Sequence, residues 1–237
     1  MAGPSILLTG ATGNLGAVIL EQLLAANYTV HAVIRSLAKH HGHFERNYST
    51  QLAAGQLQLV EIADMSVPGV FDATAAQADF ILHAATPLAY SDFRAAMIEP
   101  AWTINHNVLT AAAKSGRVRR VIITGTIAAC MWFYKDLFKP ERTISAETWN
   151  ETPDEVAADN VRNAYGYSKV TSEKKSWAFM KENKPGYDLV FLLAPAITGK
   201  SIQPGFAPSK EHLGGTAAIW RELFDRESVG FLPPWFM

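Results

Sequence analysis

The sequence predicts an α/β fold in which helices cover both faces of a mainly parallel sheet. Short apolar runs, typical of buried parallel strands, alternate with segments of helical periodicity along most of the chain. The composition agrees, because 49% of the 237 residues are hydrophobic and 18% are charged. That is enough apolar material for a sizeable core, and it excludes disorder as the main state.

Six strands are expected, most of them continuously apolar. They are Ser5–Thr9, Tyr28–Ile34, Leu57–Ile62, Phe80–His83, Arg120–Thr124 and Asp188–Leu193. Helical periodicity is found at 15–26, 93–114 and 163–183. Pro100 lies inside the second of these segments and is expected to kink or divide it, because proline lacks an N–H donor. This alternation predicts βαβ units with right-handed crossovers.

The charge balance and the single cysteine limit the range of partners. The 21 basic and 22 acidic residues give a formal net charge of −1, and no apolar run approaches the ~18 residues of a membrane span. Cys130 cannot form an internal disulfide and is expected to be a small buried residue, and the first residues lack the basic region of a signal peptide. We therefore expect a cytoplasmic protein without nucleic-acid or membrane partners.

A glycine-rich loop, TGATGNLG at residues 9–16, follows the first strand directly. In a phosphate-binding loop Gly10 permits the tight turn, Gly13 lets the backbone approach a pyrophosphate, and Gly16 allows close helix–strand packing. A structural turn is the alternative reading. The strand before the loop and the helix after it favour a dinucleotide, bound by the free N–H groups at the helix N-terminus. The predicted fold is therefore a Rossmann-type doubly wound parallel sheet.

The end of the second strand indicates which dinucleotide binds. An NAD site places an acidic residue there, against the ribose 2′-hydroxyl. This chain instead has Arg35, Ser36 and Lys39, whose two cations and hydroxyl suit a 2′-phosphate. The alternative is a pair of ordinary surface cations. We predict NADP as the cofactor.

Three histidines, His40, His41 and His43, follow this segment. No carboxylate or cysteine follows at ligand spacing, so we expect a solvated loop and no metal site. The aromatic run Trp132, Phe133 and Tyr134 is interpreted either as core packing or as a substrate lining.

Tyr165 and Lys169 are four residues apart, so both project from one face of the last predicted helix. An ammonium beside a phenol favours the phenolate, so we expect the pKa of Tyr165 to fall below its usual value near ~10. Such a tyrosine can exchange protons at neutral pH. Thr126 ends the fifth strand and offers a hydroxyl that can orient a substrate carbonyl toward Tyr165.

The glycine-rich loop together with YGYSK at residues 165–169 resembles the extended short-chain dehydrogenase/reductases. The chain is most similar to their dihydroflavonol reductase, cinnamoyl-CoA reductase and methylglyoxal reductase branch, from about residue 5 to about residue 200. The resemblance implies hydride transfer from NADPH to a small-molecule carbonyl substrate. Tyr165 would act as general acid, Lys169 would hold the nicotinamide ribose, and Thr126 would share the carbonyl oxygen. By analogy, a homodimer is expected through the helices that begin near residues 93 and 163.

The resemblance also assigns cofactor contacts. Asp64 is implied to contact the adenine, residues 83–87 to form the loop after the fourth strand, and Pro195 and Thr198 to lie near the nicotinamide. The full predicted cofactor-binding set is Gly10, Thr12, Gly13, Asn14, Leu15, Gly16, Arg35, Ser36, Lys39, Asp64, Met65, Ala84, Ala85, Thr86, Tyr165, Lys169, Pro195 and Thr198.

The chain departs from the family pattern in three places. Gly125 and Thr126 stand where two serines are usual, APAITGK follows the sixth strand at residues 194–200, and the chain ends where relatives continue. We therefore expect residues 1–195 to form an NADP-binding domain that carries the Tyr–Lys pair, and 196–237 a truncated substrate-binding region. These departures leave two alternatives to a carbonyl reductase. One is a truncated NADP-binding sensor, scaffold or partner subunit, and the other is an isomerase or dehydratase that retains its cofactor.

Overall fold

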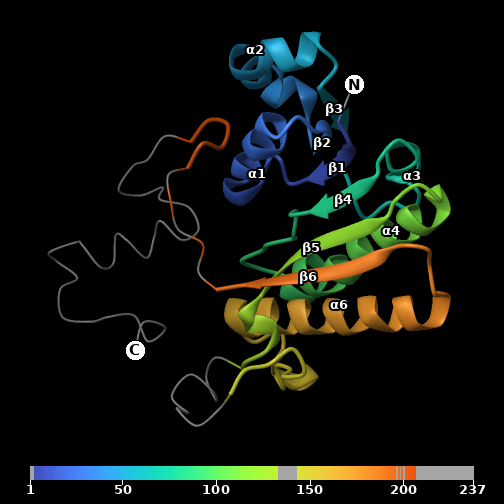
Figure 1. Ribbon diagram of the computed structural model, residues 1–237. Helices are drawn as coiled ribbons and strands as arrows, with labels where there is room; N and C mark the ends of the chain where they lie inside the picture. Colours follow the sequence, from blue (N-terminus) through green and yellow to red (C-terminus); the bar gives the residue numbers. More distant parts are fainter. Residues whose placement is uncertain (1–2, 133–142, 196, 198, 200, 207–237) are drawn as a thin grey trace, which may run out of the picture.

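The computed structural model describes residues 3–132, 143–195, 197, 199 and 201–206. Its centre is a six-stranded sheet with the order β3-β2-β1-β4-β5-β6, in which every pair is parallel. The strands are β1 (Ser5–Thr9), β2 (Thr29–Ile34), β3 (Leu57–Glu61), β4 (Phe80–His83), β5 (Arg120–Thr126) and β6 (Asp188–Ala194). The predicted doubly wound parallel sheet is confirmed. Because every pair is parallel, the carboxyl ends of the strands share one edge of the sheet, and the arrows of β1, β4 and β6 point toward it in Figure 1.

Helices connect the strands. They are α1 (Asn14–Ala25), α2 (Leu37–Ala53), α3 (Asp72–Ala75), α4 (Glu99–Ser115) and α6 (Val161–Asn183), with the short turns η1 (Arg94–Ile98), η2 (Ile127–Ala129) and η3 (Asp154–Val156). Pro100 lies in the first turn of α4, where its missing N–H has no helical partner to lose. The π-helical turn η1 precedes it, so the predicted second helix is divided. Among the described helices, none has the length and apolar character that would cross a membrane.

The loop predicted for His40, His41 and His43 is wrong, because all three lie on α2. The Ser36 hydroxyl caps this helix by accepting a hydrogen bond from the Lys39 amide at 3.3 Å. Polar residues dominate α2, and the residues it buries are Phe44 and Tyr48. The polar character of the segment as a whole, rather than a lack of helical pattern, explains why this helix is missed from sequence.

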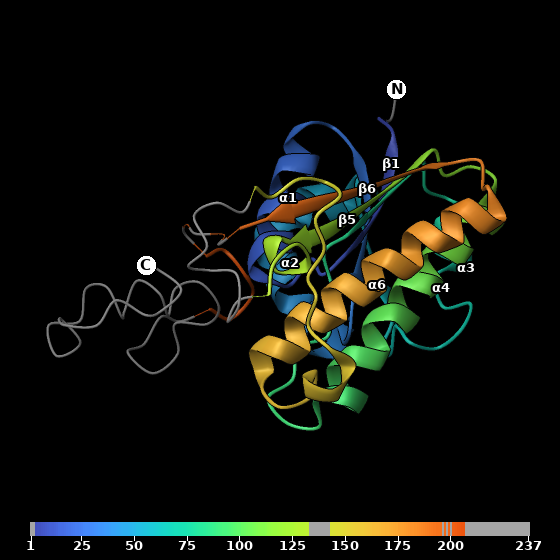
Figure 2. The ribbon, with the colours of Figure 1, turned by 90° about the horizontal axis from the view of Figure 1, so that it is seen from below.

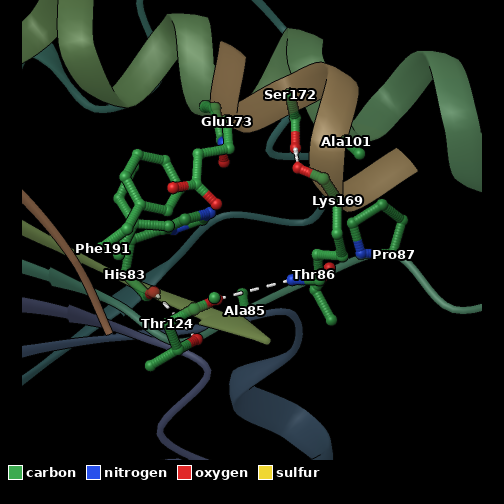
Figure 3. A pocket seen from close by; sticks show the side chains of 13 residues that line it. His83, Ala85, Thr86, Pro87, Ala101, Thr124, Lys169, Ser172, Glu173 and Phe191 are labelled. Atoms are coloured by element: carbon green, nitrogen blue, oxygen red, sulfur yellow. Dashed lines mark hydrogen bonds between the residues drawn. The ribbon is translucent and has the colours of Figure 1, made fainter. Parts of the chain in front are cut away.

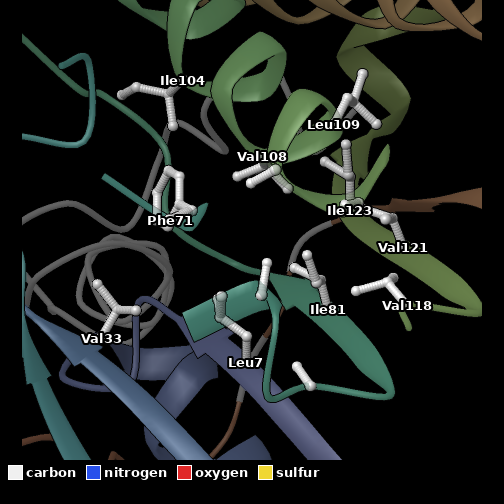
Figure 4. Packing of buried hydrophobic residues seen from close by; sticks show 14 of the residues in the cluster. Leu7, Val33, Phe71, Ile81, Ile104, Val108, Leu109, Val118, Val121 and Ile123 are labelled. Carbon is white, nitrogen blue, oxygen red and sulfur yellow. The ribbon is translucent and has the colours of Figure 1, made fainter. Parts of the chain in front are cut away.

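Two hydrophobic cores cover the two faces of the sheet. Alternate residues of a strand point to opposite faces, so Ile6 and Leu8 of β1 pack under α1 and α2 while Leu7 packs on the other face. Figure 2 shows the sheet between α1 and α2 on one side and α4 and α6 on the other. Figure 4 shows Leu7, Val33 and Ile81 of the sheet facing Ile104, Val108 and Leu109 of α4, with Phe71 among them.

We predict that Phe71→Ala lowers the free energy of unfolding by about 3–5 kcal/mol, because it leaves a cavity in a fully buried part of the core. Urea denaturation measures this change. Val67→Ala is the matched control, since this side chain lies in the same segment and is 47% exposed. A loss for Phe71→Ala no larger than for the control would contradict the observed packing.

Candidate functional site

A cavity of about 720 Å³ lies at the carboxyl edge of the sheet, where the strand order reverses between β1 and β4. This position is where open α/β sheets bind their ligands. Most of the predicted cofactor residues line it. They are Gly10, Thr12, Gly13, Asn14, Leu15, Gly16, Arg35, Ser36, Lys39, Met65, Ala84, Ala85, Thr86, Tyr165 and Pro195.

The glycine-rich loop forms the floor of this cavity. Gly10 has a φ of +76°, and a Cβ at this position would lie 2.8 Å from the amide nitrogen of Ala85. A Cβ on Gly16 would overlap the carbonyl oxygen of Gly10, so α1 packs directly against the loop. Gly13 occupies the N-cap of α1 without a side-chain cap, which leaves first-turn N–H groups available to an anion. The three glycines therefore have the geometry that a phosphate-binding loop requires.

Arg35, Ser36 and Lys39 lie together in the cavity wall at the end of β2 and the start of α2. No aspartate or glutamate is among the described residues that line the cavity. His40 also lines it, a position that the sequence alone does not assign to the site. The set supplies cations and a hydroxyl but no carboxylate to accept from a ribose 2′-hydroxyl, which suits a phosphate at this end.

Asp64, Lys169 and Thr198 are the exceptions among the predicted cofactor contacts, and Lys169 instead lines a small neighbouring cavity. The Asp64 carboxylate accepts hydrogen bonds from the amide and the hydroxyl of Ser66, at 2.8 and 2.6 Å, and these bonds lower its pKa. It is exposed and does not line the cavity, whereas the next residue, Met65, does. Thr198 lies outside the described residues. The Asp64 carboxylate therefore stabilises its own turn in this structure.

The end of β4 is held to the end of β1 by a buried polar contact. The Thr9 hydroxyl lies 2.7 Å from Nδ1 of His83 and accepts a hydrogen bond from the amide of Ala85 at 3.2 Å. His83 is 2% exposed, and burial lowers its pKa to about 3, with the charge of Lys169 acting in the same direction. A neutral imidazole therefore fixes residues 84–86 beside the glycine-rich loop.

Tyr165 and Lys169 project from α6 toward the ends of β4 and β5. The N-cap residue Asn160 sets the start of this helix by accepting hydrogen bonds from the amides of Arg162 and Asn163. The Lys169 ammonium donates to the carbonyl oxygen of Thr124 at 3.5 Å and lies 5.7 Å from the centre of the Tyr165 ring. The predicted pair therefore shares one face at the edge of the cavity.

The expected depression of the Tyr165 pKa is wrong for this structure. Burial raises the pKa of Tyr165, and a side-chain hydrogen bond with Thr126 opposes that rise. The Lys169 ammonium lies over the ring and bonds to a backbone carbonyl rather than to the phenol, so its attraction does not outweigh the desolvation of the phenolate. Burial also lowers the pKa of Lys169, to about 8. The resting site thus holds a protonated phenol near a lysine that titrates close to neutrality.

The Thr126 side chain is hydrogen-bonded to Tyr165 but does not line the large cavity. Its hydroxyl also accepts a hydrogen bond from the Ala128 amide at 3.3 Å, which begins the turn η2.

Cys130 is buried, as expected. Trp132 donates to the Asn163 side chain at 3.3 Å, which favours packing over substrate lining for this residue. Phe133 and Tyr134 lie outside the described residues.

Comparison with known proteins places this geometry in a family. Residues 6–213 match the model of the NAD dependent epimerase/dehydratase family, which corresponds to the extended short-chain dehydrogenase/reductases, and the chain belongs to this family. The ketoreductase CTB6 of Cercospora nicotianae is 31% identical over 94% of this chain. The cinnamoyl-CoA reductase CAD2 of Medicago truncatula is 30% identical over 85% of it.

A solved structure gives the same result for the fold. Gre2 from Candida albicans, in complex with NADPH, superposes with a TM-score of 0.79 at 26% identity over 92% of this chain. The chain spans 64% of the length of both CTB6 and this Gre2 structure, and 60% of CAD2. The resemblance drawn from the sequence motifs is confirmed.

Stability should depend on pH through His83, because its pKa is about 3 in the folded protein and near ~6.5 in an unfolded chain. The unfolded chain binds the extra proton, so this stabilisation is full above pH ~6.5 and declines as the pH falls toward 3. Replacing His83 with Gln removes the titrating group. We expect wild type to lose about 1 kcal/mol more unfolding free energy than His83→Gln between pH ~7 and ~5.5. Urea denaturation at the two pH values measures the difference, and equal losses would show that His83 does not set this dependence.

Proposed function

We propose that this chain is an NADPH-dependent carbonyl reductase that acts on a small aldehyde or ketone. The observation that carries the proposal is the pairing of two sets of side chains along one cavity. Arg35, Ser36 and Lys39 lie at one part of its wall, and Tyr165 lies at another with Lys169 and Thr126 in contact with it. The ketoreductase names of relatives and the NADPH in the Gre2 structures support the same reaction class.

The residues present fit an NADP dinucleotide. The N-terminus of α1 suits the pyrophosphate, Arg35 and Lys39 suit the 2′-phosphate, and a cavity of about 720 Å³ has the size of small-ligand sites. When bound, NADPH supplies a hydride to the carbonyl carbon. We assign residues 1–195 to this cofactor-binding part and residues 196–237 to part of the substrate-binding region.

Tyr165 donates the proton in the proposed reaction. Its phenol hydrogen-bonds the carbonyl oxygen and passes its proton to that oxygen as negative charge develops there. Burial keeps the phenol protonated before the reaction, which suits a general acid. The Thr126 hydroxyl holds Tyr165, and the Lys169 ammonium stabilises the phenolate that forms.

A reaction without net reduction is the second candidate, because the matching family model describes epimerases and dehydratases. The same tyrosine and lysine would then serve while the cofactor is regenerated. The third candidate function is binding of NADP without turnover. By analogy with the family, we also propose a homodimer and a cytoplasmic location. Fluorescence titration of the full chain with NADPH and NADH, followed by a panel of carbonyls that includes methylglyoxal, distinguishes the reductase from the other two candidates. Binding with NADPH consumption supports the reductase, and binding without consumption favours the other two.

Tyr165→Phe should lower kcat by about 100- to 10,000-fold, because the ring remains but the proton donor is lost. The dissociation constant of NADPH should stay within about twofold, since the phenol is not needed to hold the phosphates. Steady-state NADPH oxidation and fluorescence titration give the two values. Tyr167→Phe, two residues along the same helix, is the control and should retain wild-type turnover. A fully active Tyr165→Phe enzyme would exclude the proposed general acid.

Arg35→Ala and Lys39→Ala should each raise the dissociation constant of NADPH by about 10- to 100-fold, because each removes a charge-assisted bond to the 2′-phosphate. NADH lacks that phosphate, so its affinity should change little. Arg46→Ala, an exposed cation on α2 outside the cavity wall, is the control. Equal losses for NADPH and NADH would instead assign Arg35 and Lys39 a general structural role.

A further inference from the structure

Glu173 is a buried carboxylate to which the mechanism above gives no role. It lies on α6 one turn after Lys169 and is 5% exposed. Its carboxylate accepts a long hydrogen bond, of 3.4 Å, from Nε1 of Trp177. Burying a carboxylate is costly unless a charge or strong hydrogen bonds compensate, so this residue requires a compensating partner.

Lys169 and Glu173 line the same small cavity (Figure 3), which shares Ala85 and Thr86 with the large one. Its volume of about 10 Å³ leaves room for roughly one water molecule. The other polar side chains of its wall are those of His83, Thr86, Asn105, Thr124 and Ser172. Figure 3 shows Lys169 and Glu173 on opposite sides of this space, and no ion pair within 4 Å joins them in the described part of the chain. The two charges therefore interact across a cavity from which bulk water is excluded.

Among the described residues that line this cavity, Glu173 is the one that carries a carboxylate facing Lys169. On α6 the titratable neighbours are Tyr165 and Glu173, and from β4 His83 is neutral because its pKa is about 3. Asn105 of α4, Thr124 of β5 and Phe191 of β6 do not titrate. The attraction raises the pKa of Lys169 and lowers that of Glu173, in each case against the larger effect of burial.

We propose that Glu173 is a positioning residue, whose carboxylate keeps Lys169 in its ammonium form and directs that charge beneath Tyr165. This inference rests on the proposed function for its catalytic consequence, but the coupling of the two charges does not. Without the carboxylate, burial acts on Lys169 unopposed, and the lysine loses its proton at a lower pH. The phenol then loses the cation that stabilises its conjugate base.

Glu173→Gln tests the consequence for catalysis, because glutamine keeps the size and can still accept from Trp177. We expect the alkaline limb of the kcat/KM profile to move about 0.5–1 pH unit lower, with smaller changes below neutrality. Glu173→Asp keeps the charge and should restore most of the shift. Glu182→Gln, the same change at an exposed position of α6, should leave the profile as in wild type. An unmoved alkaline limb in a folded Glu173→Gln protein would overturn the proposal.

A second measurement needs neither cofactor nor turnover. The carboxyl ¹³C signal of Glu173 in the full chain, assigned by its loss in Glu173→Asp, gives the pKa of this group. Lys169→Met should raise that pKa by about 0.5 unit or more, because the attracting cation is gone. An unchanged pKa would overturn the coupling even if Glu173→Gln failed to fold. If Lys169→Met raises the pKa of Glu173 but the wild-type chain shows no reductase activity, the coupling of the two charges is supported and only the proposed reaction is contradicted.

Discussion

The close approach of the loops after β1 and β4 is the constraint on which the site depends. The two strands are neighbours in the sheet, but 70 residues separate Thr9 from Asp79, the residue before β4 begins. Gly10 lies against the backbone of Ala84 and Ala85 with no space for a side chain. The contact of the Thr9 hydroxyl with His83 and Ala85 holds this approach from below. Any side chain at Gly10 would separate the loops and alter the cavity they enclose.

Burial, rather than attraction between charges, sets the protonation states around the reacting groups. It keeps His83 neutral, raises the pKa of Tyr165 and lowers that of Lys169. Desolvation brings the pKa of Lys169 down to about 8, and the charge of Glu173 acts against that shift. A protonated phenol beside a lysine of lowered pKa is able to give a proton, whereas a pre-formed phenolate would be able to take one.

The sequence predicts the parts of this protein that follow from local rules. The continuous apolar runs of β1 and β4 identify the strands to the residue, and the glycine spacing identifies the loop that joins β1 to α1. The four-residue spacing of Tyr165 and Lys169 places both on one helical face. Helix α2 escapes prediction because Phe44 and Tyr48 are its buried anchors in an otherwise polar sequence. The strand order could be expected from the fold class, but no single residue encodes it.

Properties that depend on distant residues could not be predicted in the same way. The expected effect of Lys169 on Tyr165 follows from spacing alone, whereas the observed effect depends on the depth of burial and on the carbonyl of Thr124, 45 residues away. Glu173 shows no motif signal, because a glutamate at helical spacing from a lysine is ordinary on a surface. Its significance arises only when the sheet closes one side of α6 and removes both charges from water.

Exposed and buried cations therefore have different tasks in this site. Arg35 and Lys39 lie at the wall of an open cavity, where water screens their charges from the rest of the chain and leaves them accessible to a ligand. Lys169 lies where the surrounding dielectric is low, so a change of one nearby charge alters its protonation. A substitution at Arg35 should thus change mainly the affinity for a dinucleotide, while a substitution near Lys169 should change the protonation of Lys169 itself.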